Sequence, residues 1–459
     1  MSSISWIRRV VVGGAWGGFL LCLPAALAGG CGGGAEPPGS MGTVGGNVPP
    51  KTDPELGPES PPDALAAAIV FDDSRVHDAR LQMSAEDWQS IVDDTRGDEY
   101  RHAKFYLDGV VIADVGVRPS GESSRVPGNP KMSVRVQFDA FRDGAQLGGF
   151  DSLKLSGSWD DPLIFRDRLA YWYFAQLTPT PREVATELIV NGESKGAFEI
   201  EQHWDRKSIK ANFSEPYGPL YRLRGMIGSD PYEFKGADPV LYVPLPWDPV
   251  GSHASDDPAV IGQALGALAA APTDYGQVFD ANSVLTYFAA NAALANTDGF
   301  TGELEIDDHF EYFDPRDSRF HMLPWDPDNT FGSINDPPDR DIFKNYQKSI
   351  LTRMLRDSDV RERYLAKLEE VMAKIPLDAL FAQADAIFNQ IHDSVARDQL
   401  KQYPTAHFEW SLGYIKDFMT KRYASVTAQI AAYRAMPPAT ATTAPGAGTD
   451  TGTGAQGTP

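Results

Sequence analysis

The sequence predicts an α+β protein with a β-rich first half and a mostly helical second half. Two observations support this class. Before about residue 225, short apolar or alternating runs are separated by turn dipeptides such as Asp108-Gly109 and Asn191-Gly192, which are strong hairpin signals. After about residue 275, apolar residues recur at helical spacing over long stretches. The sequence shows no internal repeat.

The expected strands are short, and one helix interrupts them. Strands are predicted at 68–71, 78–82, 102–107, 110–117 and 131–138, followed by a hairpin over 187–201. The helix is predicted at 162–177, where Leu163, Leu169 and Tyr173 recur at helical spacing. Asn282 or Ser283 is a plausible N-cap for the first helix of the second half. The helices of that half are predicted at 282–296, 350–356, 360–375, 377–400 and 409–433.

The composition is compatible with one large folded domain. A chain of 459 residues is long enough for about three average domains. The segments after Cys31 and after Met436 are, however, rich in small and polar residues and nearly free of aromatic ones, as expected of disordered chain. We therefore predict a tether at 31–64, a folded domain at 65–435 and a tail at 436–459. The domain's N-terminal lobe is expected at about 65–225 and its C-terminal lobe at about 275–435.

The N-terminus has the pattern of a bacterial secretory signal. Arg8 and Arg9 precede an apolar, glycine-containing run over 10–27, and small residues lead to Cys31. This resembles a lipobox, in which the cysteine carries lipid, although Ala28 stands where Leu is usual. An uncleaved transmembrane anchor is the alternative, but the glycines and the abrupt polar exit argue against it. We expect a signal peptide at 1–30, lipidation of Cys31, and an exported lipoprotein anchored to a membrane of the cell envelope.

The cysteines and the net charge limit stabilisation and partners. Cys22 lies inside the predicted signal, so the mature chain has no second cysteine with which Cys31 could form an intramolecular disulfide. The formal net charge of −22 disfavours nucleic acid as a partner, because an acidic surface repels phosphates. A nucleotide site on this chain would need local basic residues and a metal ion. The ordinary role of such a surface is solubility.

Several standard catalytic motifs are absent, and the remaining candidate is a group of aspartates in the second half. The sequence has no P-loop, Gly-x-Ser-x-Gly, His-Glu-x-x-His or Cys-x-x-Cys motif. Asp326 and Asp328 end a short apolar strand at alternate positions, from which both can reach one Mg²⁺. Asp298 follows a helix on a separate loop and could orient a hydroxyl for attack.

Two other interpretations of these aspartates stay open. They can be ordinary turn or cap residues, because Asp commonly fills turns. Calcium binding is the second, since Asp326, Asp328 and Thr330 match three ligand positions of an EF-hand loop. That loop would, however, have Phe331 where Gly is needed and Pro337 where Glu is needed.

A series of segments resembles the CotH kinase family. The segment Arg118-Pro-Ser-Gly-Glu-Ser-Ser124 and the strand Lys131–Phe138 are similar to the family's Gly-x-Arg-x-Arg-Gly-Asn-Ser-Ser and Lys-Lys-Ser-Tyr-Arg-Ile-Lys-Phe. The motif Pro-Trp-Asp-Pro-Asp-Asn-Thr-Phe-Gly, which ends at Gly332, is the most specific. The matches appear in family order and span roughly residues 71–433. Further matches lie at 161–170, 190–201, 218–222 and 296–299.

The resemblance implies a two-lobed atypical protein kinase that uses ATP and Mg²⁺ or Mn²⁺. Asp298 would be the catalytic aspartate. Asp326 would hold the metal ion, assisted by Asp328 and by His309, which stands near the family's second metal ligand. Without the resemblance, the basic candidates of the first lobe would be interpreted as exposed strand charges. The implied nucleotide contacts are Arg118, Ser123, Ser124, Lys131, Lys154 and Glu201, the last paired with one of the lysines.

The chain departs from the family pattern at several of these positions. Ser120 replaces the second Arg, Glu122 the Asn and Met132 the second Lys, and Asp308-His309 stands where relatives have an Asn. Two functions therefore stay open. The first is ATP-dependent phosphoryl transfer to a Ser or Thr hydroxyl of an exported protein. The second is a weak or inactive pseudokinase that acts as a binding or structural lipoprotein at the cell surface.

Overall fold

The computed structural model combines strands and helices, which confirms the α+β class. The residues that it describes all belong to one compact unit of the chain, 51–459. The predicted signal peptide, Cys31, most of the tether and the tail lie outside them. None of the described helices is long and apolar enough to cross a membrane. The described ranges are 55–93, 97–121, 124–214, 217–224, 230–251, 257–300, 309–333, 336–344 and 349–436.

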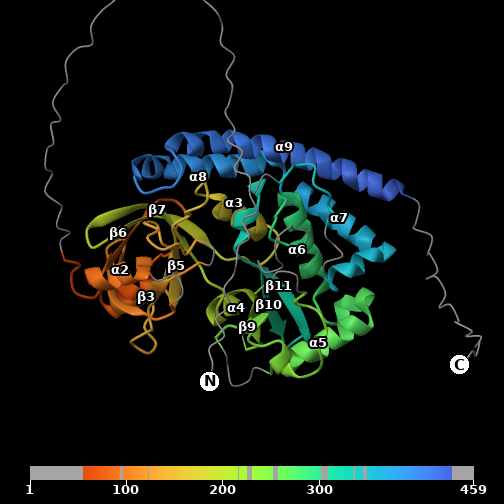
Figure 1. Ribbon diagram of the computed structural model, residues 1–459, viewed down its shortest axis with the longest axis horizontal. Helices are drawn as coiled ribbons and strands as arrows, with labels where there is room; N and C mark the ends of the chain where they lie inside the picture. Colours follow the sequence, from red (N-terminus) through yellow and green to blue (C-terminus); the bar gives the residue numbers. More distant parts are fainter. Residues whose placement is uncertain are drawn as a thin grey trace, which may run out of the picture. The chain divides into compact units, whose positions relative to one another are not determined.

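Seven strands of the first half close into a barrel (Figure 1). Neighbouring strands run antiparallel, except that the first strand closes the barrel by pairing in parallel with the sixth. Asp108 and Asn191 both have positive φ in their two-residue turns, which fits the hairpins expected there. The order around the barrel is β1 (His77–Gln82), β2 (Arg101–Leu107), β3 (Val110–Pro119), β4 (Val134–Gln137), β5 (Ser152–Ser156), β7 (Glu193–Glu201) and β6 (Glu183–Val190).

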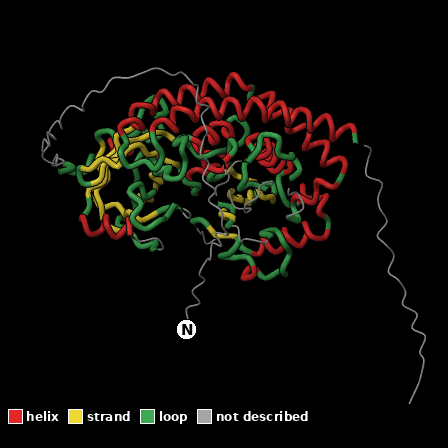
Figure 2. Tube along the Cα trace, turned by 45° about the horizontal axis from the view of Figure 1, so that its top comes forward, coloured by secondary structure: helices red, strands yellow, loops and turns green. Residues whose placement is uncertain are grey.

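The structure also contains a smaller antiparallel sheet, built from strands between residues 220 and 324, that the sequence did not predict as a whole. Figure 2 shows the described strands in two groups. Only the strand that precedes Asp326 was expected, because the others are short or adjoin irregular segments. The order across this sheet is β11 (Arg319–Pro324), β10 (His309–Asp314), β8 (Leu220–Leu223) and β9 (Trp247–Pro249).

The helices of the second half pack on this sheet and on one another. α6 is mostly apolar and is buried on all sides from Val284 to Leu294, and it contacts β11 and α7. α8 and α9 lie side by side, and α8 also reaches strand β7 of the barrel (Figure 1). The described helices are α1 (Pro62–Ala67), α2 (Ala85–Asp93), α3 (Arg166–Ala175), α4 (Arg206–Asn212), α5 (Ala259–Ala270), α6 (Ala281–Leu294), α7 (Ser358–Lys374), α8 (Leu377–Arg397) and α9 (Thr405–Ala435), with short 3₁₀ turns between some of them.

Two expectations about the first half differ from the structure. The expected strand at 68–71 is a turn after α1: Val70 is buried and Ile69 is exposed, so the apolar run packs without pairing. The strand pairing does not divide the molecule into the two kinase-like lobes that were expected, because the first half closes on itself as a barrel.

The packed chain also extends back into the segment expected to be a tether. Leu56 is buried, and the Ser60 amide donates to the Val111 carbonyl oxygen at 2.8 Å. Glu59 accepts two hydrogen bonds from the Arg142 guanidinium. These contacts attach residues 55–60 to the outside of the barrel.

Candidate functional site

A row of charged side chains crosses the barrel from β3 to β7. Cross-strand pairing places Arg118 beside Arg135, Arg135 beside Lys154, and Lys154 beside Glu201. Directly paired residues project from the same face of a sheet, so the four side chains form one continuous line.

Three members of this row, Arg118, Arg135 and Lys154, form one wall of a cleft of about 470 Å³. The second sheet contributes the opposite wall, through Arg222 and Arg224 of β8 and its extension and through Asp248 of β9. The lining side chains are mostly charged, and the cations outnumber the carboxylates, although the whole chain carries −22. The lining residues are Asp98, Arg118, Ser120, Gly121, Arg125, Arg135, Leu153, Lys154, His203, Arg222, Arg224, Asp248, Pro249, Val250, Gly251, Trp325 and Asp326.

Lys154 lies between two carboxylates at the inner end of the cleft. Its Nζ is 2.6 Å from Glu201 Oε2 and 3.7 Å from Asp326 Oδ1, and it lies over the Trp325 ring at 5.6 Å. Burial disfavours the ammonium form, but the two carboxylates outweigh burial and raise the pKa of Lys154. The structure thus brings together three of the residues singled out from the sequence.

A tyrosine of helix α3 fixes the turn that carries Asp326. Asp326 has a left-handed backbone, with φ of 50°, and its amide donates to the Tyr171 hydroxyl at 2.9 Å. That hydroxyl in turn donates to Glu201 Oε1 at 3.1 Å. Burial, then Glu201 and Asp326, raise the pKa of Tyr171 well above its usual value, so the phenol keeps its proton and the bridge persists.

The amide of Asn329 connects the other two aspartates. Its Nδ2 is 2.7 Å from Asp328 Oδ1 and 3.4 Å from Asp298 Oδ2. Burial raises the pKa of Asp328 well above its usual value, and the charges of Asp326 and Asp298 raise it further. Carboxylate oxygens such as those of Asp326 and Asp328 are the ligands that a hard divalent cation prefers.

The loop that carries Asp298 is held by buried amides. The Asp298 amide donates to Asn296 Oδ1 at 3.0 Å, and Asn296 Nδ2 donates to Asn291 Oδ1 at 2.7 Å. A Cβ on Gly299 would lie 2.5 Å from that same Asn291 oxygen, so the loop can approach helix α6 this closely only with glycine there.

Lys131 lies apart from the cleft, with its side chain only 1% exposed. Its Nζ is 2.5 Å from Asp398 Oδ2 in the turn between α8 and α9, and it also donates to the Ala197 carbonyl oxygen. Met132, where the family has its second Lys, is buried in the barrel core. Neither side chain lines the cleft.

His309 is also separate from the aspartates. It is buried on β10 among aromatic rings, including Phe300 at 5.1 Å. Its Nε2 is 2.7 Å from the Tyr232 hydroxyl, which donates to Glu311 at 2.6 Å. Burial lowers the pKa of His309 to about 3. Its contacts are those of a neutral core residue.

The candidate loop over the cleft is described in part. Arg118 lines the cleft and donates to Asp98 Oδ1 at 2.9 Å. Ser124 packs against Gly121, where an added Cβ would lie 2.4 Å from the serine Oγ. Ser123 and Glu122 lie outside the described residues.

The comparisons with known proteins agree with this arrangement. A family model described as CotH kinase protein matches residues 117–426, which is more than half of the chain. The chain belongs to the CotH kinase family. Among curated proteins, none matches it. The matched range runs from strand β3 to helix α9, so it includes the CotH chain's charged row, its cleft and all three aspartates.

Several residues of this CotH family site were not singled out from the sequence. Arg135, Tyr171 and His203 belong to regular elements or their ends, and nothing in their local sequence marks them. Asp167 is another: burial, then Asp328 and Asp326, raise its pKa well above the usual value. Asp167 and Tyr171 are four residues apart and therefore lie on one face of α3. This spacing is the one sequence signal that could have found these two residues.

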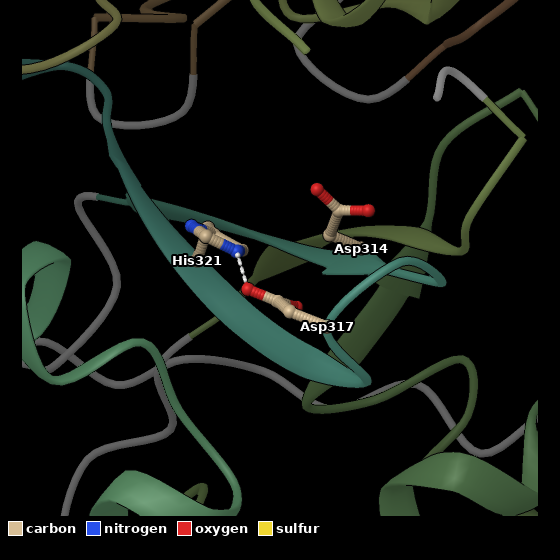
Figure 3. A group of neighbouring side chains, drawn as sticks. All are labelled: Asp314, Asp317 and His321. Carbon is tan, nitrogen blue, oxygen red and sulfur yellow. Dashed lines mark hydrogen bonds and ion pairs between the residues drawn. The ribbon is translucent and has the colours of Figure 1, made fainter. Parts of the chain in front are cut away.

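A second group of possible metal ligands lies on the β10–β11 hairpin (Figure 3). Ligand atoms of Asp314, Asp317 and His321 lie within 4.8 Å of one another. His321 Nε2 contacts Asp317 Oδ2 at 3.0 Å, and Arg316 binds both oxygens of Asp314. Arg319 donates its amide to Asp317. These contacts lie within the hairpin and stabilise it, which explains why the three side chains are close together.

Proposed function

We propose that this CotH family protein transfers the γ-phosphoryl group of ATP to a Ser or Thr hydroxyl of an exported protein. The observation that supports this best is Lys154, held between Glu201 and Asp326 at the inner end of a cation-lined cleft. A chain with net charge −22 repels a triphosphate. A local excess of guanidinium groups in the cleft offsets that repulsion.

Asp326 and Asp328 would hold a Mg²⁺ or Mn²⁺ ion, since carboxylates provide the oxygen ligands that such ions prefer. When bound, the ion would neutralise charge on the β- and γ-phosphates. Lys154 would contact the phosphate oxygens, with Glu201 fixing its position. Asp298, linked to Asp328 through Asn329, would orient the acceptor hydroxyl.

The kinase-like division into two lobes is part of this proposal. The barrel would serve as the N-terminal lobe, and the second sheet with its helices as the C-terminal lobe. The cleft lies between strands of the two groups. A signal peptide at 1–30, a lipid on Cys31 and anchoring to the cell envelope complete the proposal, and the acceptor would then be another exported protein.

A second candidate function is an inactive pseudokinase that binds a partner at the cell surface. One observation favours it: two predicted phosphate contacts are engaged within the chain, Lys131 with Asp398 and Arg118 with Asp98. Under this alternative the cleft would bind no nucleotide.

Two substitutions in the full-length protein test the proposed roles. Asp326→Ala should abolish metal-dependent ATP binding, because the triphosphate loses its neutralising ion. Asp298→Asn should leave binding nearly intact and lower phosphoryl transfer by ~10²–10⁴-fold. Calorimetry with ATP and Mg²⁺, together with transfer from labelled ATP, separates the two effects. Wild-type protein that binds no ATP with either Mg²⁺ or Mn²⁺ would leave only the pseudokinase.

A further inference from the structure

His203 lines the cleft just beyond the charged pair at its inner end. It follows Glu201 by two residues, and it lies against the same aromatic ring as Lys154. The His203 ring centroid is 4.9 Å from that of Trp325, and Lys154 Nζ is 5.6 Å from the Trp325 ring. Pro249 and Val250 of the opposite wall line the same cleft. A nucleotide with its phosphates at Lys154 would reach this part of the cleft with its base.

The hydrogen bonds of the His203 ring fix its tautomer. Nδ1 is 2.7 Å from the Trp204 carbonyl oxygen. A carbonyl oxygen can only accept, so Nδ1 carries the proton and Nε2 keeps its lone pair. Edge-to-face contacts with Trp325 at 4.9 Å and Phe310 at 5.6 Å hold the ring in this orientation. Within the described residues, Nε2 has no hydrogen-bond partner.

The surroundings keep this ring neutral. Burial lowers the pKa of His203 well below its usual value, and the nearby Arg135 and Arg222 lower it further. A neutral ring whose only proton is already donated cannot bind a phosphate oxygen. It can only accept, so the ligand group opposite Nε2 must be a donor. The donors on ATP are the exocyclic amine of adenine and the ribose hydroxyls.

We propose that His203 Nε2 accepts a hydrogen bond from the 6-amine of adenine and thereby selects adenine nucleotides. The apolar side chains of Pro249 and Val250 favour the base over the ribose at this place, because they suit a flat aromatic ring. This inference rests on the proposed function, since it assumes that the cleft binds ATP. It assigns specificity to a residue that the phosphate and metal contacts do not involve.

Calorimetry on the full-length protein with Mg²⁺ tests this assignment. ATP is compared with purine riboside triphosphate, which differs only by lacking the 6-amine. A net hydrogen bond is worth about 1 kcal/mol, so wild-type protein should bind the analogue about five-fold more weakly. His203→Phe keeps the ring and its packing but removes the acceptor. It should bind ATP about five-fold more weakly and should no longer distinguish the two ligands.

His203→Gln is the matched variant, because its amide oxygen can replace Nε2. It should keep part of the discrimination, which a merely structural role for the ring would not predict. Equal wild-type affinities for ATP and the analogue would overturn the inference while leaving the proposed function intact. Discrimination against 2′- or 3′-deoxy-ATP in place of the base analogue would also overturn it, in favour of ribose recognition. Absence of any ATP binding would overturn both proposals.

Discussion

Two lysines of the barrel, Lys131 and Lys154, each form a short ion pair with a buried carboxylate, yet their surroundings differ. Lys131 and Asp398 are both only 1% exposed, and the lysine also donates to a backbone carbonyl oxygen. The Asp398 carboxylate accepts the amides of Ala197 and Leu400 as well. Each partner has its hydrogen-bonding groups occupied by the protein itself.

Lys154, in contrast, borders the cleft. Its pair with Glu201 is joined by a second carboxylate, Asp326, whose side chain is 32% exposed. The pKa values of the two lysines also differ. Burial lowers the pKa of Lys131, while the two carboxylates raise the pKa of Lys154. An ion pair that is enclosed and hydrogen-bonded by the protein, as Lys131–Asp398 is, is called here a saturated pair. Such a pair fixes one part of the fold to another. A pair that leaves charge and open space beside it can bind a ligand.

The largest expected effect comes from breaking the saturated pair. Asp398→Ala leaves the Lys131 ammonium buried without a carboxylate, which should reduce the free energy of unfolding by about 3–5 kcal/mol. The partly exposed pair of Asp385 with Lys416 offers a control: Asp385→Ala should cost less than about 1 kcal/mol. Urea unfolding measures both. Similar small losses in the two variants would show that the buried pair contributes no more than a surface pair.

The next effect separates binding from stability. Lys154→Met would remove the proposed charge-assisted contact to phosphate and should weaken ATP binding by about 10–100-fold. Lys131→Met should leave ATP affinity unchanged and lower the free energy of unfolding. Lys421→Met, on the exposed face of α9, controls for the loss of a lysine. Loss of ATP binding in Lys131→Met would contradict the distinction, provided that the variant is folded by circular dichroism.

The last effect depends on pH and concerns Glu311, a buried carboxylate that is not paired with a lysine. Burial raises the pKa of Glu311 to about 8, above its ordinary value in the unfolded chain. The stability linked to this shift is complete below about pH 4.5 and is lost as pH rises toward 8. Glu311→Gln should therefore match wild type near pH 4 and exceed its stability at pH 8 by about 4 kcal/mol. Equal stabilities at pH 8 would mean that Glu311 ionises without cost.

The sequence predicts those parts of the site that are contiguous in the chain. Asp326 and Asp328 could be singled out because the strand before them and the turn around them form one local motif. The hairpins at Asp108 and Asn191 were predictable for the same reason. Arg135 and Tyr171 were missed, because a strand arginine and a helix tyrosine carry no local mark of what they face.

Lys131 shows why pattern alone misplaces a residue. Its sequence context predicts a strand, as that of Lys154 does, but Lys131 lies in the turn before β4 whereas Lys154 is on β5, and the two have different partners. The partner of Lys131, Asp398, lies 267 residues away in the sequence and in no recognisable motif. The closure of the barrel was unpredictable for a similar reason, because it depends on pairing between strands that are far apart in the chain.

The parallel pairing of β1 with β6 also constrains the order in which the molecule assembles. His77 pairs with Thr186, more than a hundred residues later, so the barrel cannot close until most of its chain has been made. Long-range pairing of this kind raises the contact order and slows folding. The Lys131–Asp398 pair must wait longer still, for the turn before α9. Because the chain is synthesised from its N-terminus, strand β1 has an unpaired edge until β6 has been made. An unpaired sheet edge can pair with other chains and cause aggregation during this time.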